Sequence, residues 1–181
     1  MPNRKVSHAV LEMIVALADN AKLSLTELTT GLPVSESDLR RRLGGLEWEL
    51  AAELMERIEA GIGPERIREL AGRIPDISSV ARGLLGRFVK PRLMLSFVFR
   101  TIGPTMYPMY DVRFEELEQP DGTVVAHLVL RLKEGFRECR TFFDLNGIGT
   151  AALPTVIGQP ALEFRAEATG RGGEYWFTLP R

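Results

Sequence analysis

The sequence predicts an α+β fold, in which an N-terminal helical subregion packs on an antiparallel β-β-α-β-β core. The first observation is a hairpin pattern: residues 110–117 and 123–132 alternate apolar and polar side chains around a Pro-Asp-Gly turn at 120–122. The second observation is an amphipathic helical stretch at 137–157, which follows this hairpin directly. Together they predict two strands followed by one helix.

A second hairpin pattern closes the core. Residues 161–168 and 174–179 form this pair, and the glycine-rich segment 169–173 joins them as a turn. Gly147, Gly149 and Pro154 make an unbroken helix over 137–157 doubtful, so its C-terminal half is expected to be partly loop.

The first hundred residues carry helical patterns separated by glycine and proline. The clearest helix is 46–60, where Leu46, Leu50, Leu54 and Ile58 form a buried stripe. The other expected helices are 7–20, 24–31, a short one from Ser35 through Leu43, 64–72, one near 77–87, and 91–102. The last of these is apolar on most faces, so we expect it to be deeply buried.

The composition shifts once along the chain, near residue 103. We therefore expect a single domain over residues 1–181, with 1–102 as a mainly helical part and 103–181 as the β-β-α-β-β part. The linking segment 103–110 carries two prolines and two tyrosines.

Charge and cysteine content exclude several classes of function. With 23 basic and 24 acidic residues among 181, the net charge of -1 gives no global electrostatic case for nucleic acid or an anionic membrane. One cysteine and two histidines exclude a disulfide framework and a cysteine-rich zinc site. The sequence shows neither a signal peptide nor a membrane span, so we expect a cytoplasmic protein.

No catalytic pattern is present, so we expect neither an enzyme nor a metal or cofactor site. Cys139 lies near Arg137 and Arg140, which would favour a reactive thiolate, but a buried inert cysteine is the favoured interpretation. His127 lies on a predicted strand, on the same face as Val125 and Val129. Haem ligation or general-base chemistry is conceivable there, although a structural or exposed histidine is favoured.

Residues 24–46 have the spacing of a helix-turn-helix. Arg40, Arg41 and Arg42 could contact phosphates, but the first turn of the second helix carries Glu36 and Asp38. A helical packing element is therefore favoured, and DNA binding through this segment remains an alternative.

Soft and aromatic side chains concentrate between residues 88 and 110. Such side chains line small-molecule pockets because they adapt in shape, and tyrosine adds a polar tip. A filled core is the competing interpretation for each of them. The predicted site for a small, largely apolar ligand lies between 91–102, 103–110 and 137–157, and its candidate residues are Phe97, Met106, Tyr107, Tyr110, Phe142 and Phe143.

Three stretches carry a family resemblance. They are 31–39 (Gly-Leu-Pro-Val-Ser-Glu-Ser-Asp-Leu) with 46–49 (Leu-Glu-Trp-Glu), the glycine- and proline-bearing 147–161, and the terminal 173–180 (Gly-Glu-Tyr-Trp-Phe-Thr-Leu-Pro). They resemble N-terminal sensory regions that precede histidine kinases and, in a related form, AraC-type regulators. The β-β-α-β-β core is similar to the haem-NO-binding-like and vinyl-reductase-type ligand domains.

The resemblance implies a cytoplasmic sensory domain that is often dimeric and regulates an attached output module or partner signalling protein. The chain lacks the Tyr-x-Ser-x-Arg haem-propionate motif and the cysteine pattern of the metal-binding relatives. Haem and metal are therefore not expected. A dimerisation or interaction module without a ligand remains a further alternative.

Overall fold

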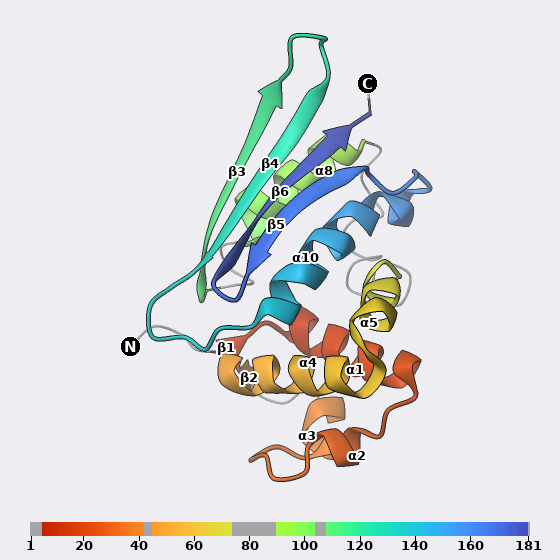
Figure 1. The fold of residues 1–181 in the computed structure, drawn as a ribbon, viewed down its shortest axis with the longest axis vertical. Helices are drawn as coiled ribbons and strands as arrows, with labels where there is room; N and C mark the ends of the chain where they lie inside the picture. Colours follow the sequence, from red (N-terminus) through yellow and green to blue (C-terminus); the bar gives the residue numbers. More distant parts are fainter. Residues whose placement is uncertain (1–4, 42–44, 74–89, 104–107, 181) are drawn as a thin grey trace.

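The computed structural model describes residues 5–41, 45–73, 90–103 and 108–180 and contains both helices and antiparallel sheets (Figure 1). The N-terminal elements are β1 (Lys5–Val6), α1 (His8–Ala21), α2 (Leu25–Leu28), α3 (Glu36–Arg41), β2 (Leu46–Glu47), α4 (Trp48–Ile62) and α5 (Pro64–Ala71). The later elements are α8 (Pro91–Phe97), the π-helix η1 (Val98–Ile102), β3 (Tyr110–Glu118), β4 (Val124–Leu132), α10 (Arg140–Ala152), the 3-10 helix η2 (Leu153–Ile157), β5 (Phe164–Thr169) and β6 (Gly172–Leu179). The expected mixture of helix and sheet is confirmed.

The C-terminal half has the predicted order of two strands, one helix and two strands. Its four strands form one antiparallel sheet in the order β3-β4-β6-β5. Helix α10 contacts β5 and β6 on one side and α4 and α5 on the other, so it lies between the sheet and the N-terminal helices (Figure 1). This helix is the structural link between the two parts of the chain.

The two faces of the sheet differ because side chains alternate along each strand. One face packs against α10 and η1, and its buried hydrophobic residues are Tyr110, Ala126, Leu128, Leu130, Leu132, Tyr175, Phe177 and Leu179. The opposite face, named the open face below, carries Asp111, Arg113, Glu115, Leu117, Val125, His127, Val129, Arg131, Arg165, Glu167, Thr169, Gly172, Glu174, Trp176 and Thr178.

The N-terminal helices bury one stripe each. On α1 the buried apolar positions follow helical spacing and are Val10, Leu11, Ile14, Leu17 and Ala18. Helix α1 ends at Ala21 and is capped by Lys22, whose φ of 58° places it in the left-handed region. Pro64 occupies the first turn of α5, where its missing N–H costs no helical hydrogen bond.

Three expectations require correction. Leu46 belongs to β2, which pairs with β1 through Val6, so the helix predicted from residue 46 begins at Trp48. Helix 91–102 is not deeply buried: Leu93 is 55% exposed, because only the face carrying Met94 and Leu95 packs against the protein. Helix 137–157 begins at Arg140 and tightens into a 3-10 turn after Ala152. The helix expected near 77–87 lies outside the described residues.

Helix α10 continues through its two glycines. Gly147 faces the sheet, where a Cβ atom would lie 2.8 Å from the ring of Tyr175 and 3.0 Å from that of Phe164. The glycine thus allows helix and sheet to approach closely, and packing outweighs the low helix propensity of the residue.

Candidate functional site

Three of the six predicted ligand residues lie in one aromatic cluster. The ring of Tyr110 stacks on Phe142 at a centroid distance of 5.2 Å and meets Phe143 edge-on at 5.3 Å. The indole of Trp48 packs edge-on against Tyr110 and Phe142, at 5.4 and 5.3 Å. These four residues, the aromatic cluster, are at most 3% exposed and come from α4, β3 and α10. The cluster therefore lies where the helical part meets the sheet.

Trp48 was not among the predicted site residues. Its side chain shares one buried face of α4 with Ala51, Ala52 and Met55, at spacings of three, four and seven residues. Leu50, which we expected in the buried stripe, is only partly buried. The signal in the sequence was the pair of alanines, because small residues one turn after a tryptophan leave room for a neighbouring element.

A polar clamp fixes the aromatic cluster to the segment before α10. The Nε1 of Trp48 donates a hydrogen bond of 2.7 Å to the carbonyl oxygen of Arg137. The guanidinium of Arg137 pairs with Glu53 at 2.7 Å and Glu56 at 2.6 Å, both on α4. Hydrogen bonds from Arg57 and Arg137 hold the pKa of Glu53 below its usual value. The hydrogen bond to Glu53 in turn raises the pKa of Arg137.

The remaining predicted ligand residues are not part of this cluster. Phe97 is half-buried at the end of α8, and Met106 and Tyr107 lie outside the described residues. The π-helix after Phe97 packs on β3 through Phe99, whose ring stacks on Phe114 at 5.8 Å. The structure thus brings Tyr110, Phe142 and Phe143 together and places Phe97 on a neighbouring element.

Cys139 is a buried thiol at the start of α10. Its side chain is fully buried, and its Sγ lies 3.9 Å from the carbonyl oxygen of Ala52. Burial raises the pKa of the Cys139 thiol to about 12, so the group is neutral at physiological pH. Because the thiolate is the nucleophile, this geometry favours the inert interpretation over the reactive one.

His127 lies on the open face and is stacked on Trp176. The two rings are 5.1 Å apart with planes 9° from parallel, and the guanidinium of Arg165 lies 4.1 Å from the centroid of Trp176. The Nε2 of His127 is 3.6 Å from Glu174 and has no hydrogen-bond partner among the described residues. The side chain therefore lies on the opposite face of the sheet from the interior that it shares with the helices.

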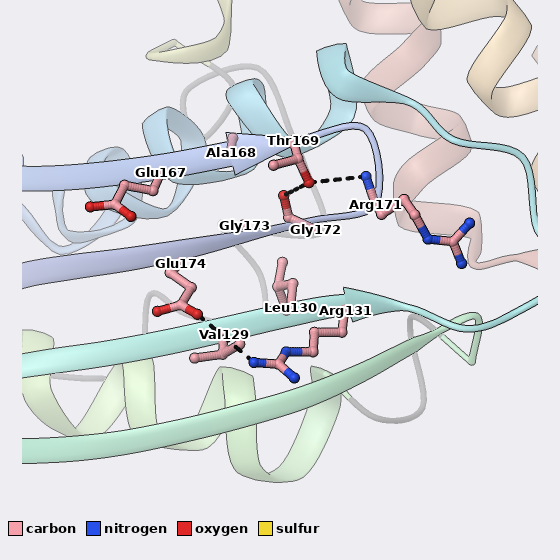
Figure 2. A pocket seen from close by; sticks show the side chains of 10 residues that line it. All are labelled: Val129, Leu130, Arg131, Glu167, Ala168, Thr169, Arg171, Gly172, Gly173 and Glu174. Carbon is pink, nitrogen blue, oxygen red and sulfur yellow. Dashed lines mark hydrogen bonds and ion pairs between the residues drawn. The ribbon is translucent and has the colours of Figure 1, made fainter.

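Two hollows flank the strand positions of Val129 and Arg131 on the open face. One, of about 360 Å³, lies beside the turn between β5 and β6, where Gly172 carries no side chain (Figure 2). The other, of about 320 Å³, lies between β3 and β4 and reaches Asp111 and His127. Charged side chains of both signs line them, which fits a polar contact surface better than an apolar ligand pocket.

The predicted helix-turn-helix is short, and Arg40, one of its three arginines, is engaged in ion pairs, while Arg42 lies outside the described residues. Helix α3 has six residues, with Glu36 and Asp38 in its first turn. Arg40 forms ion pairs with Asp19 at 2.9 Å and with Glu36 at 2.7 Å. These contacts favour the packing interpretation over DNA binding, because the guanidinium is already neutralised.

Within the described ranges, no three histidine, cysteine or acidic side chains come together as a possible metal site. The same part of the chain holds no helix with the length and apolarity needed to cross a membrane.

The fold is shared with solved H-NOX structures. An Fe(II) unliganded H-NOX protein variant from K. algicida matches with a TM-score of 0.62 at 13% identity, covering 96% of both chains. A variant of the T. tengcongensis H-NOX protein matches with a TM-score of 0.61 at 10% identity, covering 94% of both chains. An oxygen-binding H-NOX domain related to soluble guanylate cyclases, solved as its oxygen complex, matches with a TM-score of 0.61 at 9% identity, over 94% of this chain and 92% of that one.

No protein-family model and no curated protein sequence matches this chain. At identities of 9–13%, the likeness to the H-NOX structures concerns the fold.

Proposed function

We propose that this chain is a sensory domain that binds a small, largely apolar ligand between its helices and its sheet and regulates a partner protein. The observation that carries the proposal is the fold, which covers nearly the whole chain and is shared with a domain solved in complex with oxygen. Fold likeness alone does not assign function, so the residues between the two parts must also be able to accept such a ligand.

The ligand site that we propose borders the aromatic cluster and the end of α8. Phe142 and Tyr110 supply flat apolar surface, and Phe97 adds a half-buried ring from the neighbouring helix. Pockets for small molecules combine such surfaces with few polar groups. The cluster is densely packed, so ligand entry requires a shift of one of its rings.

Such a shift has a direct route to the rest of the protein. The clamp between Trp48 and Arg137 joins the cluster to α4, and Arg137 also pairs with Glu53 and Glu56. A ligand that displaces Phe142 would thus change how α10 sits against α4. A ligand acts in this way only if it binds the two arrangements with different affinity.

The haem that the H-NOX fold family implies does not fit the residues present. The chain has two histidines: His8 is exposed at the start of α1, and His127 lies on the open face against Trp176. Cys139 is fully buried at the start of α10, with its Sγ 3.9 Å from the carbonyl oxygen of Ala52. None of these groups supplies an axial ligand between helices and sheet, so the proposed ligand is an organic molecule or apolar gas bound without haem iron.

We infer a cytoplasmic, non-enzymatic domain that works as a homodimer, with a histidine kinase or a transcription regulator as its output. The resemblance of residues 31–39, 147–161 and 173–180 to sensory regions supports this output.

Native mass spectrometry of the purified chain tests the ligand. We expect an adduct that disappears on denaturation and whose occupancy falls in Phe97→Ala. The matched control is Leu93→Ala on the same helix, which removes an exposed side chain and should leave the adduct unchanged. No adduct, together with no rise in unfolding temperature across a panel of apolar metabolites, would overturn the proposal.

A separate titration with hemin tests the mismatch with haem. We expect no Soret band beyond that of free hemin, in the chain as purified or after addition. A sharp Soret band that is lost in His127→Ala would show that the histidine ligates iron and would contradict the assignment.

A further inference from the structure

The open face of the sheet has the make-up of a protein interface. Its centre holds Trp176, His127 and Val129, which are partly or fully buried by their neighbours, and charged side chains of both signs surround them. Interfaces commonly combine an aromatic centre with a polar rim rich in arginine. Among the described elements, α10 and η1 pack on the other face of the sheet, and Arg92 of α8 pairs with Glu116 on that same face.

The charges on the two edge strands follow a regular order. Strand pairing places Glu115, His127, Trp176 and Arg165 in one row across the sheet, and Arg113, Val129, Glu174 and Glu167 in the next. Each row therefore begins and ends with opposite charges. The order also reverses from one row to the next, since β3 carries Glu115 then Arg113 where β5 carries Arg165 then Glu167.

We propose that the open face binds a second copy of this chain, related by a two-fold axis. The axis runs parallel to the strands, midway between the two facing sheets and above the line between β4 and β6. That axis places β3 opposite the partner's β5 and β4 opposite the partner's β6, row by row. Glu115 then faces the partner's Arg165, and Arg113 faces the partner's Glu167. Both contacts occur twice in a symmetric dimer, and the aligned strands match a common way for sheets to pack.

Two of the three central rows match under the same axis, whereas in the third Val129 comes opposite the partner's Glu174. His127 comes opposite the partner's Trp176, so the aromatic stacks of the two copies meet. Arg131 comes opposite the partner's Gly172, where the hollow of about 360 Å³ lies (Figure 2). Position 172 accommodates no side chain, because a Cβ atom there would lie 2.4 Å from the carbonyl oxygen of Leu130.

A single-stranded nucleic acid is the other macromolecule that binds aromatic residues on an open four-stranded sheet. Two features disfavour it here. Arg165 and His127 already lie against the ring of Trp176, and Glu167 and Glu174 stand among the arginines, where they would repel phosphates. The mixture of signs fits a surface that must match itself.

The dimer interface rests on the homodimer part of the proposed function and not on any ligand. Sedimentation of the full chain over a range of concentrations, with Arg113→Glu and Glu167→Arg made separately, tests it. In each variant, residue 113 of one copy and residue 167 of the other carry the same charge at both symmetric contacts. We therefore expect the dimer dissociation constant to rise by at least about tenfold. Arg66→Glu is the matched control, because Arg66 is an exposed, acid-paired arginine on α5 and should not alter dimerisation.

Mixing the two variants gives the decisive measurement. In a heterodimer of Arg113→Glu with Glu167→Arg, both contacts again join opposite charges, so the mixture should form dimers although neither variant does alone. Changes within each chain are the same alone and mixed, so they cannot produce this rescue.

Three results would overturn the inference: a chain that is monomeric at every concentration, a dimer that neither reversal weakens, or a mixture that stays monomeric while both variants are folded. A monomer that binds a fluorescent single-stranded oligonucleotide, and loses it in Trp176→Ala, would assign the face to nucleic acid instead. A ligand adduct on a monomeric chain would leave the sensor proposal standing while this one fails.

Discussion

The indole of Trp48 donates a hydrogen bond of 2.7 Å to the backbone carbonyl of Arg137, which lies 89 residues further along the chain. The bond connects the first residue of α4 to the segment that leads into α10. This hydrogen bond lies beside the aromatic cluster. It therefore fixes the positions of the helical part, the sheet and the proposed ligand site relative to one another. Removing it should therefore affect the stability of the whole fold.

We expect Trp48→Phe to lower the free energy of unfolding by roughly 1–3 kcal/mol for the unsatisfied carbonyl, with a further loss from the smaller ring. Urea unfolding followed by circular dichroism measures the change. Trp176→Phe, measured at a concentration at which the chain is monomeric, is the control, because the indole on the open face makes stacking contacts worth about 1 kcal/mol or less. Equal losses in the two variants would show that the clamp contributes nothing specific.

The two glycines of α10 should respond in opposite ways to alanine. Gly147→Ala places a methyl group 2.8 Å from the buried ring of Tyr175, so we expect a loss of roughly 1–3 kcal/mol from overpacking. Around Gly149 the nearest atom is the carbonyl oxygen of Ala71 at 3.9 Å, so Gly149→Ala should gain up to about 1 kcal/mol of helix propensity. Thermal unfolding of both variants checks the signs, and a stabilised Gly147→Ala would contradict the close packing.

Alternation of side chains predicted the sheet well because one of its faces is buried. The strands 110–117 and 123–132 came out as Tyr110–Glu118 and Val124–Leu132. The second hairpin was less accurate, since β5 begins at Phe164 rather than residue 161 and β6 begins at Gly172 rather than 174. Glycines in a strand carry no alternating side chain, so the pattern could not include them.

The candidate site was predictable only in part. Phe142 and Phe143 stood out as adjacent aromatics on a helix, but their meeting with Trp48 depends on a contact between distant segments that no local pattern encodes. The β1–β2 pairing through Val6 and Leu46 was missed for the same reason, because strands of two residues have no periodicity. The stack of Arg165 and His127 on Trp176 became visible only once the strand register was known.

Acid should weaken the contact between α4 and the segment before α10. The pKa of the Glu53 carboxyl is lower in the folded protein than in the unfolded chain, where it is near 4.5. The ionised carboxylate therefore stabilises the fold above pH 4.5, and this stabilisation is lost as the pH falls through the pKa of the folded state. We expect Glu53→Gln to reduce the urea midpoint at pH 7 and to have a smaller effect at about pH 3, below the unfolded value. Glu65→Gln on α5, for which no ion pair is found among the described residues, is the control. A loss for Glu53→Gln that is the same at both pH values would contradict the ion-pair role.

The thiol of Cys139 should resist modification in the folded protein. Burial raises its pKa to about 12, so both access and thiolate formation are suppressed at neutral pH. With a disulfide reagent such as Ellman's reagent at pH 8, we expect reaction only at the rate of unfolding, and a full equivalent in denaturant.

The unfolded thiol ionises near pH 9, so the stabilisation from keeping it neutral should fade as the pH rises from about 9 to about 12. Cys139→Ser should remove the reaction with Ellman's reagent, and Cys139→Ala should remove that alkaline loss. Fast labelling of the native chain would show that the start of α10 opens and would revive the reactive interpretation.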